Sequence, residues 1–138
     1  MRSVAFAALL AIVGTSAALA QELDLDCTSP QDQPSTTACA VDDLGKADDE
    51  LNAVYQRAMK YQADLDKDMT EINPANIGAV KALKKAERAW IEYRDAHCEA
   101  VGFANLGGTA YATFVVGCEA ELTRNRTREL KQLMNESN

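Results

Sequence analysis

The segment around residues 83–98 limits the possible folds more than any other part of this chain. Its apolar residues and those flanking it recur at the spacing of an amphipathic helix: Val80, Leu83, Trp90 and Val101. Two charged residues, Glu87 and Arg94, lie on the same stripe. Because an isolated charge is costly to bury, these residues need partners on neighbouring helices. The segment therefore predicts a bundle of packed helices.

One further helix is predicted before this one in the sequence and one after it, which makes three in all. The first begins near residues 35–37, where hydroxyl side chains can cap exposed amides, and its period breaks over 66–74. The second begins at Asn73 and Pro74, a cap followed by proline, and runs to about Val101. The third starts near Thr109.

The apolar stripes of the first and third helices give the expected core. Their inward positions are Val41, Leu44, Leu51, Tyr55, Ala58 and Leu65, and then Val115, Cys118, Leu122, Leu130 and Leu133. The sequence contains no strand pattern and no internal repeat. The expected fold is all-α, an antiparallel bundle of three main helices stapled by disulfides. An extended N-terminal arm over 21–36, with Pro30 and Pro34, precedes it.

Residues 1–20 have the layout of a secretory signal peptide. Arg2 gives a positive start, residues 4–13 an apolar stretch, and Ala18 and Ala20 a small-residue cleavage pattern. The apolar stretch is too short to span a bilayer. Gln21 rather than a cysteine follows the cleavage point. We therefore expect export to the periplasm without a membrane anchor, leaving one domain over 21–138.

The charge of the chain restricts its partners. The formal net charge is −7, and removing the signal peptide makes it −8, because that segment holds one base and no acid. Such acidity argues against nucleic acid or an anionic membrane as a partner. It is compatible with a basic protein partner, and equally with acidity that serves solubility alone.

Four cysteines in an exported chain predict a disulfide framework. They are Cys27, Cys39, Cys98 and Cys118. Three pairings are possible, and we favour Cys27–Cys39 with Cys98–Cys118 because each pair brackets one turn-rich stretch. Zinc is a poor alternative, since the chain has no CxxC and a single histidine, His97. We expect no metal and no cofactor.

Charged residues lie on the stripes of all three predicted helices. They are Asp48, Glu87, Arg94 and Arg126. Two acids and two arginines balance, and arginine binds carboxylates well. The set is either a binding or catalytic centre or a structural ion-pair network that fixes the register of the helices. We favour the structural interpretation.

The sequence offers little catalytic chemistry. It has no GxSxG elbow, HExxH helix or phosphate-binding glycine loop, and His97 adjoins a cysteine expected to be oxidised. Neighbouring acids at 42–43 and 48–49 leave a glycosidase-like acid pair open. Most acids, however, fall on solvent-facing positions, so we expect a protein that is not an enzyme.

A glycine-containing turn between the second and third helices is a candidate partner-binding loop. Its residues are Gly102, Phe103, Asn105, Leu106, Gly107, Gly108 and Tyr111. A disulfide between Cys98 and Cys118 would clamp it, and a rigid loop can enter another protein's cleft at little ordering cost. Alternatively, Gly102 only caps a helix while Phe103 and Tyr111 pack inward.

Motifs spread over most of the chain resemble the LprI-type lysozyme inhibitor family. They are Asp48-x-x-Leu51-Asn52-x-x-Tyr55, Leu83-x-x-Ala86-x-x-Ala89-Trp90-Ile91-x-Tyr93-Arg94-Asp95-x-x-Cys98, Gly107-Gly108, and Cys118-x-x-x-Leu122-Thr123-x-x-Arg126-x-x-x-Leu130. The resemblance runs from about Cys27 to Leu133. It implies a helical, disulfide-bonded domain that binds and inhibits lysozyme in the bacterial envelope.

The resemblance also suggests how such a protein meets its target. Lysozyme is a basic protein with an acidic cleft, so an acidic partner can be steered toward it. We expect the 102–111 loop, or the acidic face around residues 42–50, to make the contact. The alternative function is a non-enzymatic envelope assembly or binding module whose partner is another protein or peptidoglycan.

Overall fold

The computed structural model describes residues 26–135, which form three long helices joined by short connections. They are α1 (Gln33–Ile72), α2 (Ala79–Gly102) and α3 (Tyr111–Leu133), with short 3-10 turns at Pro74–Asn76 and Phe103–Asn105. No strand occurs in the described part, and the all-α prediction is confirmed. The expected signal peptide and the first residues of the expected arm lie outside the described residues.

Helix α1 begins slightly earlier than the sequence analysis expected. Asp32 is its N-cap, and its carboxylate accepts a hydrogen bond from Ser35 N at 2.8 Å. Pro34 occupies the first turn, where its missing N–H costs nothing. The cap is therefore an acid and not one of the hydroxyl residues at 35–37, although Thr36 Oγ1 donates to Asp32 O.

The hairpin between α1 and α2 differs more from expectation. Helix α1 continues through the polar stretch to Ile72, and Asn73 and Pro74 start only the short 3-10 turn. Helix α2 begins at Ala79, where the Asp66 carboxylate caps it. That carboxylate accepts from the backbone N–H groups of Gly78 and Ala79, both at 2.8 Å, and of Val80 at 3.1 Å.

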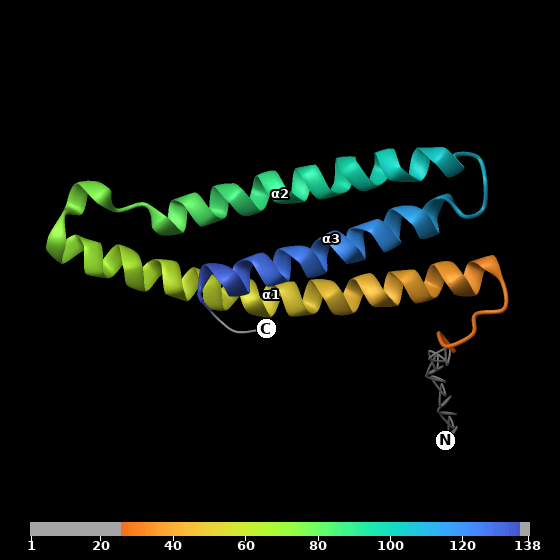
Figure 1. Cartoon of the computed structure of the whole chain (residues 1–138), viewed down its shortest axis with the longest axis horizontal. Helices are drawn as coiled ribbons and strands as arrows, with labels where there is room; N and C mark the ends of the chain where they lie inside the picture. Colours follow the sequence, from red (N-terminus) through yellow and green to blue (C-terminus); the bar gives the residue numbers. More distant parts are fainter. Residues whose placement is uncertain (1–25, 136–138) are drawn as a thin grey trace, which may run out of the picture.

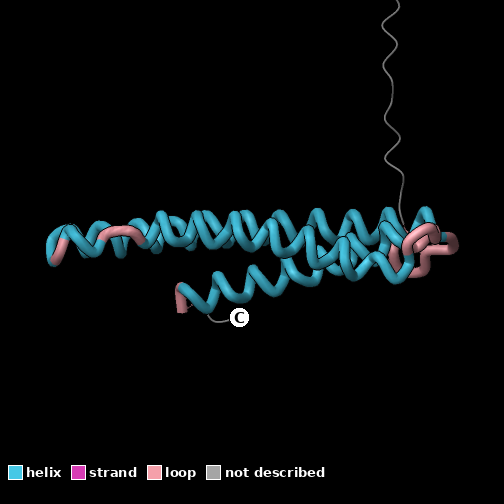
Figure 2. Tube along the Cα trace, turned by 90° about the horizontal axis from the view of Figure 1, so that it is seen from above, coloured by secondary structure: helices cyan, strands magenta, loops and turns pink. Residues whose placement is uncertain are grey.

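The three helices form an elongated, antiparallel bundle. Figure 1 shows α1 and α2 running side by side, with α3 returning parallel to α1. In the view turned by 90°, α1 and α2 overlap and α3 lies on one side of them (Figure 2). The α1–α2 hairpin extends beyond the end of α3 in both views. Helices α1 and α3 share the largest interface.

The core is a narrow column of apolar side chains between the helices. Its buried residues are Leu51, Val54, Ala58, Leu83 and Leu130, with Tyr55, Met59, Trp90 and Met134 packed against them. Four residues expected to face inward are instead exposed, namely Val41, Leu65, Val101 and Leu133. They lie toward the ends of their helices, where three helices cannot enclose every position on a stripe. Among the described residues, no helix is long and apolar enough to cross a membrane.

Candidate functional site

Both disulfides lie at one end of the bundle. Cys27–Cys39 ties residues 26–32 to the start of α1, and Cys98–Cys118 ties the end of α2 to α3. Of the three possible pairings, this is the one favoured from the sequence. We call the region formed by residues 26–41 and 98–118 the disulfide end. It contains the α2–α3 connection and the start of α1 (Figure 1).

Part of the predicted loop is a packed structural element. Gly102 is buried in the last turn of α2. A Cβ at this position would collide with Val115 Cγ2 and lie 2.9 Å from Tyr111 Cε2. Gly102 therefore permits the close approach of α2 and α3, and it presents no side chain to a partner. Tyr111 is half-buried against it.

The middle of the loop is exposed and internally bonded. The side chains of Phe103 and Leu106 are 55% and 63% exposed, while Asn105 is half-buried. Leu106 N donates to Phe103 O at 3.1 Å, and Gly108 N donates to Asn105 O at 3.0 Å. Gly107 has φ +82°, in the left-handed region that favours glycine. The loop thus presents two apolar side chains on an ordered backbone.

A polar contact that the sequence analysis missed joins α1 to α3 beside this loop. Thr113 Oγ1 lies 2.7 Å from both Gln33 Nε2 and Thr37 Oγ1. Next to it is a shallow, mainly apolar depression of about 610 Å³, lined by Gln33, Pro34, Thr37, Ala38, Val41 and Thr109. The pairing depends on how the two helices meet, and no local sequence pattern signals it. The loop and the depression together give the disulfide end an exposed apolar surface.

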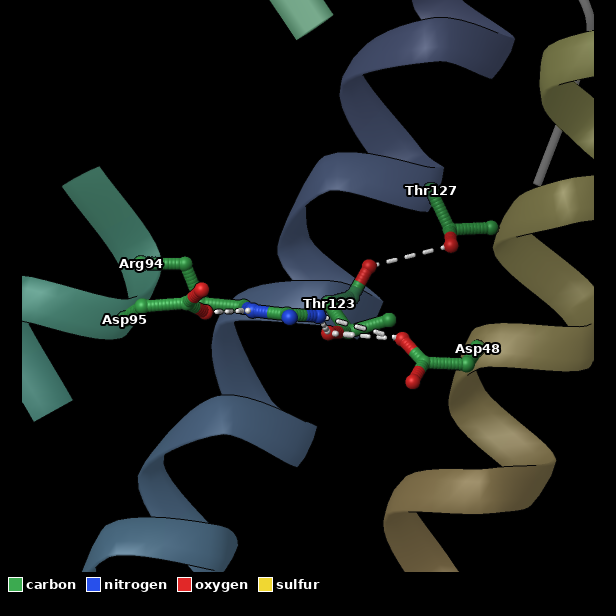
Figure 3. Close-up of polar contacts among 5 residues, drawn as sticks. All are labelled: Asp48, Arg94, Asp95, Thr123 and Thr127. Atoms are coloured by element: carbon green, nitrogen blue, oxygen red, sulfur yellow. Dashed lines mark hydrogen bonds and ion pairs between the residues drawn. The ribbon is translucent and has the colours of Figure 1, made fainter. Parts of the chain in front are cut away.

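Arg94 joins all three helices through its guanidinium group (Figure 3). Its Nη1 lies 3.2 Å from Asp48 Oδ1 on α1 and 3.2 Å from Thr123 Oγ1 on α3, and its Nε donates to Asp95. Thr123 is fully buried, and Thr127 Oγ1 donates to its carbonyl. The guanidinium also lies 5.2 Å from the centre of the Trp90 ring. The sequence analysis did not assign Thr123 to this cluster, because a lone threonine on a helix carries no clear signal of burial.

Arg126 forms a second, separate cluster. Its Nε donates to Glu87 at 3.0 Å, and its Nη1 donates to Glu129 at 2.9 Å. The side chains of Arg126 and Glu87 are 14% and 12% exposed, which makes this pair more enclosed than Arg94–Asp48. The four charged stripe residues therefore meet as two ion pairs that link different helices.

One acid near Arg94 has a shifted pKa. Burial raises the pKa of Glu119, and the nearby Asp95 and Asp48 act in the same direction, while Arg94 opposes them. A raised pKa would suit a general acid. A raised pKa alone does not define a catalytic site, so we assign Glu119 no catalytic role.

The remaining candidates for chemistry are occupied or isolated. Asp42 forms an ion pair with Lys46, and Asp43 forms one with Arg124, so both acids at 42–43 have a basic partner. His97 is exposed and stacks on Tyr93 at 5.3 Å between ring centres. Within residues 26–135, no group of three or more His, Cys, Asp or Glu side chains is placed to hold a metal ion.

The arrangement of two disulfides and three helices can be compared with known proteins. A family model described as Lysozyme inhibitor LprI matches residues 27–130, which is most of the chain. The chain belongs to the LprI family. The resemblance noted from the sequence motifs is thereby confirmed, and the matched region contains both disulfides, both ion-pair clusters and the loop.

Two proteins and one solved structure are similar to this LprI family member. An uncharacterized protein of Rhizobium meliloti (strain 1021) is 45% identical over 134 residues, covering 97% of this chain and 96% of its own. The uncharacterized protein YecT of Escherichia coli (strain K12) is 26% identical over 102 residues, covering 71% of this chain and 62% of YecT. A crystal structure of a DUF1311 family protein from Pseudomonas putida KT2440 is similar, with a TM-score of 0.60 and 26% identity, covering 78% of this chain and 98% of that one.

Proposed function

We propose that this chain is an exported binding protein that inhibits lysozyme by placing its disulfide end in the lysozyme cleft. Membership of the family described as Lysozyme inhibitor LprI supports the target. The net charge of −7 supports association with a basic enzyme, because opposite charges steer encounter. The signal-peptide pattern of residues 1–20 and the two disulfides support the proposed periplasmic location.

The observation that carries the proposal is the exposed pair Phe103 and Leu106 on an ordered loop. Cys98–Cys118 holds the helices on both sides of the loop, and backbone hydrogen bonds fix its interior. Exposed apolar side chains on a preorganised backbone lose little entropy on binding, which favours affinity. Large apolar anchors of this kind dominate the energy of many protein interfaces.

The proposal describes a binding protein and not an enzyme. Asp48 and Glu87, the two acids on the predicted helix stripes, each pair with an arginine from another helix. Asp48 Oδ1 and Glu87 Oε2 are thus each bonded to an arginine of another helix. The disulfide end, in contrast, exposes the apolar side chains of Phe103 and Leu106.

The double variant Phe103→Ala/Leu106→Ala tests the site. We expect it to raise the concentration for half-maximal inhibition about tenfold or more, because two buried anchors would be lost from the complex. The matched control is Ile72→Ala/Ile77→Ala, which removes two exposed apolar side chains at the opposite end of the hairpin. Inhibition is followed by the clearing of a bacterial cell-wall suspension by lysozyme.

The two variants separate the possible outcomes. Thermal unfolding of both should match the parent protein, because all four side chains are exposed. Equal inhibition by the loop variant and the parent would move the site away from this loop, most plainly to the acidic face around residues 42–50. Loss of inhibition in the Ile72/Ile77 control would equally contradict the assignment.

A further inference from the structure

A second surface, unrelated to the disulfide end, has the features of a small-ligand site. It is a groove between α1 and α2 with a volume of about 530 Å³. It is lined by Asp48, Leu51, Asn52, Tyr55, Lys84, Glu87, Arg88, Trp90, Ile91 and Arg94. None of these residues belongs to α3, which lies on one side of the α1–α2 pair (Figure 2). The volume is in the range typical of pockets for small organic molecules.

Part of the groove is lined by aromatic and aliphatic side chains. Trp90 and Tyr55 are half-buried and pack against the core, and Ile91 is 41% exposed beside them. These two aromatic rings give the groove a partly exposed apolar surface. Such a surface suits a ligand with a ring-shaped, partly apolar body.

The floor of the groove offers hydrogen-bond acceptors. Asp48 Oδ1 is already bonded to Arg94, but Oδ2 has no partner among residues 26–135. The Asp48 side chain is 40% exposed, and Asn52 on the next turn is exposed. Arg94 pairs with both Asp48 and Asp95, and Arg126 pairs with both Glu87 and Glu129. Asp48 Oδ2 and the Asn52 side-chain oxygen can therefore accept hydrogen bonds from ligand hydroxyl groups.

The rim of the groove is basic in an otherwise acidic protein. Lys84 and Arg88 line it, one turn apart on the exposed side of α2, and neither forms an ion pair with any described residue. Lys81 and Lys85 lie on the same helix face but outside the groove. Two cations that have no ion-pair partner among residues 26–135 favour an anionic group on the ligand.

We propose that this groove binds an acidic saccharide, that is, a hydroxylated sugar ring bearing a carboxylate. Lys84 and Arg88 bind the carboxylate, and Trp90 and Tyr55 contact the ring. Asp48 and Asn52 accept hydrogen bonds from the sugar hydroxyl groups. A mono- or disaccharide matches the volume of the groove, whereas a folded partner would need a much larger surface. This binding is independent of lysozyme inhibition, since it uses neither the loop nor the disulfides.

Tryptophan fluorescence can follow binding in the groove, because Trp90 lines it and is the single tryptophan of the chain. The oxidised protein is titrated with N-acetylmuramic acid and with galacturonic acid, following tryptophan fluorescence and, in parallel, calorimetric heat. N-acetylglucosamine, sodium acetate and a short polyglutamate peptide are the controls. We expect saturable binding of an acidic sugar that exceeds binding of every control. The acid sugar bound more tightly identifies the source of the ligand.

Two matched charge variants assign the site. We expect Lys84→Gln/Arg88→Gln to weaken binding about tenfold or more, because two charge-assisted contacts are lost. Lys81→Gln/Lys85→Gln removes the same charge from the same helix face and should leave affinity unchanged. All four side chains are exposed, so both variants should fold.

Several outcomes would overturn the proposal. They are the absence of saturable heat with either acid sugar, equal binding of N-acetylglucosamine, acetate or polyglutamate, and equal weakening in both charge variants. Failure here leaves lysozyme inhibition untouched, since Phe103→Ala/Leu106→Ala alters only the disulfide end. The two accounts can therefore fail separately.

Discussion

Glu87 and Arg126 form the most enclosed ion pair among residues 26–135, and their surroundings make it important for stability. Removing one partner of such a pair leaves the other charge without compensation. We expect Glu87→Ala to lower the free energy of unfolding by about 3 kcal/mol. Arg94→Ala should lower the free energy of unfolding by less, about 2 kcal/mol, because Asp48 is more exposed and keeps solvent contact.

Urea unfolding followed by circular dichroism measures both changes. Asp42→Ala is the control, since the Asp42–Lys46 pair is exposed and should leave the unfolding midpoint unchanged. If Glu87→Ala and Arg94→Ala behaved like this control, the charged stripe residues would not be structural.

Helix α2 depends on a cap supplied by another helix. The three backbone hydrogen bonds that Asp66 accepts, from Gly78, Ala79 and Val80, lower the pKa of its carboxyl below the ordinary value. A carboxyl with a lowered folded pKa stabilises the protein above its unfolded pKa, and this stabilisation is lost as pH falls through the folded pKa. The α1–α2 hairpin is therefore expected to loosen in acid.

Asp66→Asn separates this effect from general acid unfolding. At pH 7 we expect the variant to melt below the parent protein, because an amide cannot accept all three hydrogen bonds as a charged group does. The difference should begin to shrink as the pH falls below about 4, where the unfolded chain becomes protonated, and should shrink further through the lower pKa of the folded carboxyl. Melting temperatures at several pH values measure it, and a difference that stayed constant or grew in acid would contradict the cap.

The elements show how far sequence patterns reach. Apolar and charged residues at helical spacing were enough to predict three helices, because the stripe must face a core. The predicted start of α2 was wrong by several residues, because the residue that caps α2, Asp66, lies in the preceding helix and gives no local sequence signal. The exposure of Val41 and Val101 was missed for a related reason, because a spacing pattern does not tell where the neighbouring helices end.

The candidate sites show the same division. Glycines and a flanking cysteine pair marked the 102–111 loop, but only the packing of Gly102 against Val115 tells which loop residues face outward. The basic rim at Lys84 and Arg88 is visible in the sequence, yet its relation to Asn52 and Tyr55 depends on the pairing of α1 with α2. Sequence spacing gives the faces of one helix and not the surfaces shared between two.

At the scale of the whole molecule, the rod has two unlike ends. Both disulfides and the exposed loop lie at one end, and the other end is a hairpin that extends past α3 (Figure 1). Disulfides stabilise mainly by restricting the unfolded chain, and here they also hold the groups proposed to bind lysozyme. Reduction of the disulfides should therefore weaken inhibition, because it disturbs the disulfide end more than the distant α1–α2 hairpin.

Titration of lysozyme with the oxidised protein tests the central claim most directly. Lysis of a bacterial cell-wall suspension is followed against several lysozymes, with the protein oxidised or fully reduced. We expect inhibition that reaches its end point near one molecule per lysozyme and is lost on reduction. Undiminished lysis by every lysozyme at micromolar excess of the oxidised protein would contradict the account.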